Sequence, residues 1–241
     1  MPRKKSLDTR TAKQKQVVDI DLARKFHIKQ PYKLTENQVS FLEISQKNET
    51  QIILCDGPAG SSKTFCAVYV ALQMLQQKQA DNIIYVRSIV ESATRKLGSL
   101  PGEVDEKFKP WIIPFLEKCD ELISTQAADS LIESGYINCI PVNFLRGSTF
   151  KNCVVIVDEA QNLEISEIVT ILTRFGLNCK MFIIGDTLQS DINKSCFKTI
   201  FETFDDESSK KNGIQSFKFT EDDIVRSKIL KFIVNKVKKL R

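Results

Sequence analysis

The usual signals for metal binding, secretion and membrane insertion are missing from this sequence. Its 241 residues hold one histidine, His27, and seven cysteines with no Cys-x-x-Cys pair among them, so we do not expect a zinc site. No apolar run approaches the ~20 residues that span a bilayer, and no apolar segment follows the N-terminal stretch MPRKKSLDTR. The odd number of cysteines favours free thiols. These absences predict a cytoplasmic protein with no membrane partner.

Positive charge is concentrated at the two ends of the chain. The formal net charge is +5, and six lysines or arginines lie in residues 3–15 and six more in residues 228–241. Such ends are either solvated tails or a source of sequence-independent attraction to nucleic-acid phosphates. Both interpretations stay open at this point.

Short apolar runs alternate with helical patterns along the chain. We expect helices over 35–45, 63–78 and 166–174 and strands over 51–56, 82–87, 136–144, 153–158, 180–185 and 214–219. This alternation predicts an α/β fold with a mostly parallel sheet that helices cover on both faces. Residues 1–30 are expected to form a basic, flexible arm, and residues 31–241 a single domain. Gly98–Pro114 has three prolines and two glycines, which predicts a long surface excursion.

A loop that resembles a phosphate-binding loop follows the first strand. The stretch GPAGSSKT departs from the pattern G-x-x-x-x-G-K-[ST] at one position, where Ser62 replaces glycine. Backbone N–H groups of such a loop, at a helix N-terminus, bind phosphates. Lys63 would reach the β- and γ-phosphates and Thr64 would hold Mg²⁺. The predicted nucleotide-binding loop comprises Gly57, Pro58, Ala59, Gly60, Ser61, Ser62, Lys63 and Thr64.

Ser62 retains the backbone N–H that the loop needs. If the position requires a positive φ, a non-glycine residue costs about 1–2 kcal/mol, which corresponds to roughly tenfold weaker binding. The substitution therefore predicts a weaker or slower site that still works.

Two later strands end in polar residues. Asp158 follows the run Val154–Val157 and could hold the water shell of Mg²⁺, while Glu159 could orient and deprotonate an attacking water. The alternative is an acidic helix N-terminus, but the preceding phosphate loop favours metal and base. Gln189 follows the strand at 181–185 and could sense the γ-phosphate, with Asp186 as its link; the alternative is a Gly-Asp turn.

Taken together, these motifs resemble the PhoH family, phosphate-starvation-inducible ATPases related to superfamily-one helicases. The resemblance runs in collinear order over residues 35–230 and rests on the segments LGSLPGE at 97–103, EK at 106–107, Pro110, FLRGSTF at 144–150, DEAQN at 158–162, LTRFG at 172–176, GD at 185–186 with Gln189 and Asp191, and DIVR at 223–226. It implies a RecA-like P-loop NTPase core that binds ATP and Mg²⁺, with Lys63 and Thr64 on phosphate and metal, Asp158 on metal, Glu159 on water and Gln189 on the γ-phosphate.

The resemblance adds one candidate and two departures. Gln38 matches a glutamine that relatives place near the adenine, but it also fits a capping box with Thr35; we favour the adenine contact. Ser62 replaces the family's glycine, and Ser148 stands where a second arginine is usual. Arg146 is then the one arginine of this stretch that could contact phosphate or a neighbouring subunit.

Related helicases close ATP between two RecA-like domains, and the second supplies an arginine finger. With room for one such domain, this chain is expected to be a homo-oligomer, with a hexameric ring as one form. The finger candidates are Arg174 and Arg226, followed by Arg146. For each of them, an ordinary surface or inter-helix ion pair is an equal alternative.

The predicted function is ATP hydrolysis with Mg²⁺, coupled to RNA or single-stranded DNA. Besides the basic ends, the residues that favour a nucleic-acid partner are Arg95, Lys96, Lys107, Lys109 and Trp111. Trp111 and Phe115 could instead pin that segment to the core. The main alternative function is a nucleotide-gated binding module with little hydrolysis. A small-molecule kinase is disfavoured because Glu159 and Gln189 suit attack by water. The sequence lacks the spaced acidic cluster that a fused PIN nuclease domain would need, so we do not expect RNA cleavage.

Overall fold

The fold is built on one six-stranded parallel sheet. A computed structural model describes residues 25–31, 33–87, 104–145, 147, 149–187, 189, 196–225 and 228–237. The strand order is β3-β2-β4-β5-β1-β6, with all neighbours parallel. The strands are β1 (Ile52–Asp56), β2 (Asn82–Arg87), β3 (Ile137–Pro141), β4 (Cys153–Asp158), β5 (Lys180–Gly185) and β6 (Ile214–Lys218). All six predicted strands are present, and the α/β class is confirmed.

Burial explains why these runs form the middle of a parallel sheet. Every residue of β1, β4 and β5 is buried, because helices cover both faces of such a sheet and leave no side of a strand in water. The register places Arg87 beside Asp158 and Asp56 beside Gly185. The carboxyl ends of four strands therefore meet at one edge.

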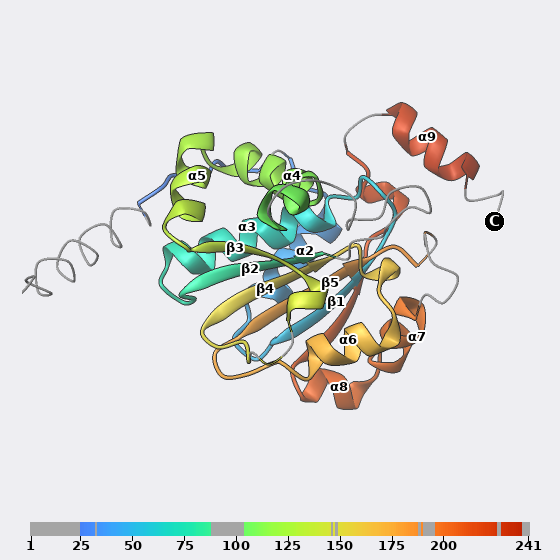
Figure 1. Ribbon diagram of the computed structural model, residues 1–241. Coiled ribbons are helices and arrows are strands. Elements are labelled where there is room, and N and C mark those ends of the chain that lie inside the picture. The colour runs from blue at the N-terminus through green and yellow to red at the C-terminus, as the bar shows by residue number, and fades with distance from the viewer. Residues whose placement is uncertain are drawn as a thin grey trace, which may run out of the picture.

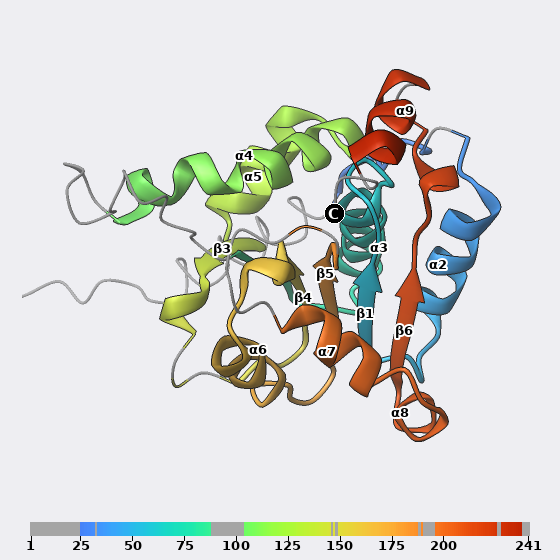
Figure 2. The ribbon, with the colours of Figure 1, turned by 90° about the vertical axis from the view of Figure 1, so that its right-hand side faces the viewer.

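Helices lie on both faces of the sheet (Figures 1 and 2). One face carries α2 (Glu36–Gln46), α3 (Lys63–Gln76), α4 (Val104–Leu122) and α5 (Thr125–Glu133), and the other carries α6 (Ile165–Leu172) and α7 (Phe197–Thr203). Two further helices are α8 (Glu207–Lys211) and α9 (Lys228–Val237), and short 3-10 helices follow β3, β4 and β6 at Val142–Phe144, Ala160–Asn162 and Glu221–Asp223. The two faces hold separate apolar cores, one around Phe41 and Phe115 and one around Ile168 and Phe197.

The predicted surface excursion over Gly98–Pro114 is wrong for its second half. Helix α4 begins at Val104 and continues through Pro110 and Pro114. Each proline removes one backbone donor from the helix. Burial of Phe115 and of the residues that follow it at helical spacing, Cys119 and Leu122, offsets that loss. Residues 98–103 lie outside the described residues.

Part of the segment expected to form a flexible arm packs against the domain. Phe26 is buried, and its carbonyl accepts a hydrogen bond from Gln76 of α3. The backbone N–H of Lys29 donates to the carbonyl of Leu122 at 2.7 Å. Residues 25–30 therefore dock because Phe26 and Ile28 add to the core under α3 and α4, while His27 is exposed. Residues 1–24 lie outside the described residues.

None of the helices within the described ranges is long and apolar enough to cross a membrane.

Candidate functional site

A cavity of about 660 Å³ lies at the carboxyl ends of the strands. This is where open parallel sheets place their ligands, and the volume falls within the range of small-molecule sites. The cavity is lined by residues of the loop after β1, by the acidic residues after β4, by Asp186 and Gln189 after β5, and by Gln38 of α2. Helix α4 closes one side with Glu117, Lys118 and Glu121.

The loop between β1 and α3 requires glycine at two of its positions. A Cβ on Gly57 would lie 2.6 Å from the Cβ of Phe219, so only glycine fits there. Gly60 has φ +83°, a conformation that side chains rarely adopt. The Ser61 hydroxyl donates to the carbonyl of Pro58 at 2.8 Å and braces the turn. The loop then enters the N-terminus of α3, where backbone N–H groups attract anions.

Ser62 adopts the left-handed conformation, with φ 70° and ψ 21°. The condition under which serine costs about 1–2 kcal/mol is therefore met. Its side chain makes no capping hydrogen bond to α3, so nothing local offsets that cost. The next residue, Lys63, turns its ammonium back onto the loop and donates to the carbonyls of Gly57 at 2.6 Å and Pro58 at 2.9 Å.

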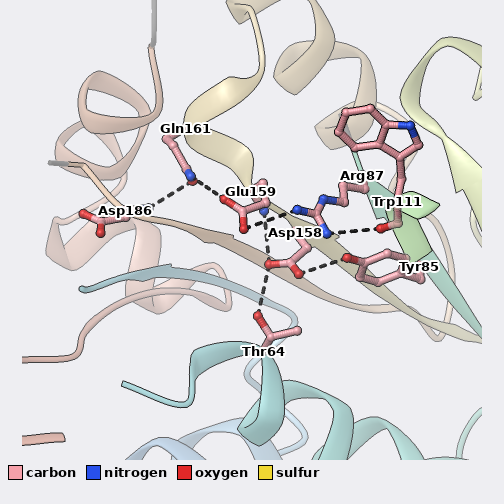
Figure 3. A network of polar contacts seen from close by, with 8 residues as sticks. All are labelled: Thr64, Tyr85, Arg87, Trp111, Asp158, Glu159, Gln161 and Asp186. Carbon is pink, nitrogen blue, oxygen red and sulfur yellow. Dashed lines mark hydrogen bonds and ion pairs between the residues drawn. The ribbon is translucent and has the colours of Figure 1, made fainter. Parts of the chain in front are cut away.

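Asp158, the last residue of β4, is hydrogen-bonded to the loop that follows β1 (Figure 3). Its carboxylate accepts from the Thr64 hydroxyl at 3.1 Å, from the Tyr85 hydroxyl at 3.0 Å and from the backbone N–H of Glu159 at 3.1 Å. Asp158 is buried. Burial of Tyr85 and the negative charge of Asp158 both raise the pKa of the Tyr85 hydroxyl, so this hydroxyl stays a donor. The two predicted metal ligands, Thr64 and Asp158, are in direct contact.

The donors around Thr64 and Asp158 fit Mg²⁺. Both offer oxygen, which Mg²⁺ prefers, and Mg²⁺ is usually held by one or two carboxylates together with substrate phosphates. Among the described residues no group of three or more His, Cys, Asp or Glu side chains could hold a metal. A single carboxylate beside a hydroxyl thus suits an ion whose other ligands are the phosphates of a bound nucleotide and water.

Glu159 is held by two neighbours in a strained backbone conformation. Its φ is 56°, in the left-handed region. One carboxylate oxygen lies 3.6 Å from the guanidinium of Arg87, and the other accepts from the amide of Gln161. Burial and the adjacent Asp158 raise the pKa of Glu159, while Arg87 opposes that rise. Proton affinity is therefore increased at the group predicted to act as a base.

Gln161 continues the network toward the strand that follows. Its amide oxygen accepts from the backbone N–H of Asp186 at 3.1 Å, and the N–H of Gln189 donates to the carbonyl of Asp186 at 3.0 Å. The predicted link from Gln189 to the site thus runs through the backbone of Asp186. The side chain of Gln189 is exposed and borders the cavity.

Gln38 forms the capping box that the sequence allows as an alternative to an adenine contact. It exchanges hydrogen bonds with Thr35 at 3.1 Å in both directions. Its amide hydrogens donate to the carbonyls of Ser61 at 3.2 Å and Asp223 at 3.0 Å. Gln38 is fully buried and borders the cavity. Its amide hydrogens are therefore used within the protein, where they tie α2 to the phosphate loop.

The arginine candidates do not border the cavity as far as the structure describes them. Arg174 follows α6, and its carbonyl accepts from the N–H of Phe150 just before β4, so it lies toward the amino end of the sheet. Its Nε is buried and has no hydrogen-bond partner among the described residues. Arg226 and Arg146 lie outside the described residues.

Sequence reasoning missed Tyr85 and Arg87, which contact the two acidic residues. A signal for Arg87 was present, because Asn82–Arg87 is an apolar strand that ends in a charged residue, as Cys153–Asp158 does. Asp56 ends β1 in the same way, is buried, and accepts from the N–H of Thr187 at 2.8 Å and its hydroxyl at 3.1 Å. Parallel strands bring such residues to one edge.

Comparison with known proteins identifies the family. The family described as PhoH-like protein matches residues 32–238. A PhoH-like protein of Synechocystis is 38% identical over 158 residues, which cover 66% of this chain and 47% of that protein. A PhoH-like protein of Bacillus subtilis is 31% identical, over 83% of this chain and 61% of the relative, and Protein PhoH of Escherichia coli is 30% identical, over 80% and 55%. The chain spans about half the length of these relatives.

Two solved structures are distantly similar. The large terminase of a thermophilic bacteriophage in complex with ADP has a TM-score of 0.48 and 14% identity, over 81% of this chain and 48% of the other. Pif1 of Bacteroides in complex with ADP-AlF4 has a TM-score of 0.40 and 16% identity, over 84% and 45%. Likenesses at this level carry no argument about the site.

Proposed function

The chain belongs to the PhoH-like protein family and has an α/β, RecA-like P-loop fold, and from that premise we propose that it binds ATP with Mg²⁺ and hydrolyses it. The observation that carries the proposal is the hydrogen bond between Thr64 and Asp158. It joins the hydroxyl of the phosphate loop to the acidic strand inside one cavity, beside a carboxylate suited to accept a proton.

Each residue of the site has a distinct task in this proposal. The loop N–H groups and Lys63 bind the phosphates, and Lys63 leaves the carbonyls of Gly57 and Pro58 to do so. Thr64 and Asp158 hold Mg²⁺, which when bound neutralises charge on the phosphates. Glu159 orients a water molecule in line with the terminal phosphorus and accepts its proton. Gln189 contacts that water or the γ-phosphate.

Two substitutions test this assignment. Lys63→Ala is expected to weaken ATP binding and lower turnover together, because it removes the cation of the loop. Glu159→Gln is expected to keep ATP affinity and lower turnover on the order of 10²-fold or more, the usual contribution of a general base. Phosphate release and nucleotide binding measure the two effects.

The matched control is Lys198→Ala, which removes a lysine from an exposed pair with Glu202 at 3.9 Å. It is expected to leave both binding and turnover unchanged. Undiminished turnover in both Lys63→Ala and Glu159→Gln would overturn the proposed site.

We further propose that the protein is a homo-oligomer, a hexameric ring being one form, in which a neighbour supplies the arginine finger. Helix α9 exposes the apolar residues Ile229, Phe232 and Ile233 beside Lys231 and Lys236. Helix α6 exposes Ile165 and Val169, and its N-terminus carries Glu164 at the N-cap and Glu167 in the first turn. The two faces match in apolar character and oppose in charge, which fits a second copy of the chain.

These faces lie on different sides of the molecule (Figures 1 and 2), so their contact would be head-to-tail and closes into a ring if the rotation allows. Mass photometry with and without ATP tests this. Phe232→Glu is expected to dissociate the assembly, whereas Leu177→Glu, at a leucine that is more exposed than Phe232 and lies outside both helices, is expected to leave it intact. A strict monomer in all conditions would remove the finger in trans.

Finally, we propose that hydrolysis is coupled to RNA or single-stranded DNA. The net charge of +5 and the lysines of α9 support this coupling. Single-stranded RNA is expected to raise ATP turnover at low salt, with the gain lost as salt increases. Turnover that RNA and single-stranded DNA leave unchanged at every salt concentration would overturn the coupling while leaving the ATPase intact.

The second candidate function is a nucleotide-gated binding module with little hydrolysis. The left-handed conformation of Ser62 favours it, because strain in the loop is one way in which catalysis is relaxed. Under this alternative, Ser62→Gly sharply raises turnover.

A further inference from the structure

We propose that Arg87 is the positioning residue for Glu159 and that it makes the orientation of this carboxylate depend on helix α4. The inference rests on the proposed function, in which Glu159 orients the attacking water. It adds a residue on β2 that touches neither phosphate nor metal in that scheme. It also adds a route by which occupancy of the cavity reaches Glu159.

The guanidinium of Arg87 connects two elements (Figure 3). Its Nη1 donates to the carbonyl of Trp111 on α4 at 3.1 Å, and its Nη2 lies 3.6 Å from the carboxylate of Glu159. The Arg87 side chain is 16% exposed, which limits its freedom to leave these partners. A planar guanidinium offers donors in a rigid fork, so the position of one partner sets that of the other.

Glu159 depends on such support. Its side chain is 40% exposed, and its backbone is in the left-handed region. Among the described residues, its carboxylate oxygens form an ion pair with Arg87 and accept a hydrogen bond from Gln161. Without Arg87 one side of the carboxylate is released. A misplacement of about 1 Å at a reacting group costs on the order of 10²-fold in rate.

The same junction contacts the metal ligand. Tyr85 lies two residues before Arg87, on the same face of β2, and donates to Asp158. Its ring stacks on Phe115 of α4, with centroids 4.4 Å apart and planes at 21°. Phe115 is one helical turn after Trp111. One turn of α4 thus contacts Asp158 and Glu159 through two neighbouring side chains of β2.

Helix α4 also borders the cavity. Glu117, Lys118 and Glu121 line it within the turns that follow Phe115. A nucleotide that fills the cavity would contact α4, and a shift of α4 would move the carbonyl of Trp111. Through Arg87 that shift reaches Glu159, so binding of the substrate and placement of the base become linked.

Turnover of three variants tests the role of Arg87. Arg87→Met is expected to lower kcat about 10- to 100-fold and to leave the KM for ATP within about twofold. Arg87→Lys is expected to recover part of the loss, because an ammonium retains charge but lacks the fork. In the Glu159→Gln background, Arg87→Met is expected to cause no further loss, since residues that act as a unit are not additive.

The link to α4 has its own readout. Trp111 is the only tryptophan in the chain, so tryptophan emission reports on this junction. Addition of ATP with Mg²⁺ is expected to change the emission of the wild-type protein, of Glu159→Gln and of Arg87→Met, because the nucleotide moves α4 whether or not Arg87 is present. Lys198→Met is the matched control, at a lysine far from the junction in an exposed ion pair, and is expected to behave as wild type. If Arg87→Met does not fold, Arg87→Gln and Arg87→Lys carry the same comparison.

The outcomes separate this inference from the proposed function. Full turnover in Glu159→Gln would overturn the role of Glu159 on which this inference rests, and full turnover in Lys63→Ala as well would overturn the proposed function. Loss of turnover in Glu159→Gln with full turnover in Arg87→Met would overturn only the role of Arg87. A further multiplicative loss in the double variant, or tryptophan emission that ATP leaves unchanged in the wild-type protein, would overturn the link from α4 through Arg87.

Discussion

Buried charged side chains have different hydrogen-bond partners at the two ends of the sheet. At the carboxyl end, Asp56 and Asp158 are buried and bound by side chains from other elements, among them Thr64 and Tyr85. At the amino end, buried Lys180 donates its ammonium to the carbonyls of Ser45 and Lys47, where α2 ends. Side-chain partners can exchange for a ligand, whereas a helix terminus needs a permanent donor.

Backbone conformation separates the same two regions. Among non-glycine residues with positive φ, Lys78, Asn152 and Asn178 lie at the amino end, and asparagine tolerates that conformation. Ser62 and Glu159 lie at the carboxyl end and are poorly suited to it. Strain of this kind gathers at functional sites. The strained residues of the carboxyl end, Ser62 and Glu159, both belong to the proposed site.

The largest expected effect on stability is at the amino end. Lys180→Met is expected to lower the free energy of unfolding by about 3 kcal/mol, because two carbonyls lose hydrogen bonds from a charged donor. Turnover of ATP is expected to be unchanged at temperatures where the variant is folded. Chemical denaturation at pH 7 measures the loss. Lys210→Met is the control, since Lys210 lies in the last turn of the exposed helix α8 and pairs with Glu207.

The same substitution has a pH signature. Burial lowers the pKa of Lys180 from 10.5 to about 8. The folded protein releases this proton at lower pH than the unfolded chain does, so the unfolded state binds more protons between pH 8 and 10.5. Wild-type stability should therefore rise over that interval relative to Lys180→Met. If the stabilities of the two proteins changed with pH in parallel, the pKa of Lys180 would be the same in the folded and unfolded states. The two carbonyls would then stabilise the charged ammonium as well as water does.

A smaller effect is expected at the carboxyl end from Tyr85→Phe. It removes a hydrogen bond to a buried carboxylate and is expected to cost about 1.5 kcal/mol of stability. Asp158 then loses one of the donors that orient it, and the Mg²⁺ concentration for half-maximal turnover is expected to rise up to about tenfold. Tyr69→Phe, on α3, is the control. An unchanged Mg²⁺ requirement would separate Tyr85 from the metal site.

The smallest effect is expected from Ser62→Gly. It relieves about 1–2 kcal/mol of left-handed strain, and the greater freedom of glycine in the unfolded chain takes back about 0.5–1 kcal/mol. The net gain in stability lies between about 0 and 1.5 kcal/mol, and ATP binding is expected to be up to about tenfold tighter. Asn178→Gly, at the amino end, should gain less. A turnover increase far beyond this factor would favour the gated binding module over the hydrolase.

Periodicity and turn chemistry were enough to predict all six strands, because apolar runs between polar breaks leave few other solutions in an α/β chain. Helix α4 was missed since Pro110 and Pro114 contradict a helix locally. Tertiary burial of Phe115 and Leu122 overrides that local preference. The docked segment around Phe26 was missed for the same reason, because its partners lie about 50 residues or more along the chain.

For the site, the sequence by itself determined the loop from Gly57 to Thr64, the acidic pair Asp158–Glu159 and the membership of a family, because each is a local pattern tied to known chemistry. Which side chains support that pair was decided only by the tertiary structure. Parallel pairing places β2 beside β4, and this register alone brings Arg87 to Glu159. β2 and β4 are parallel and lie far apart in the chain, so no hairpin turn sets their register and it is fixed only when the sheet packs.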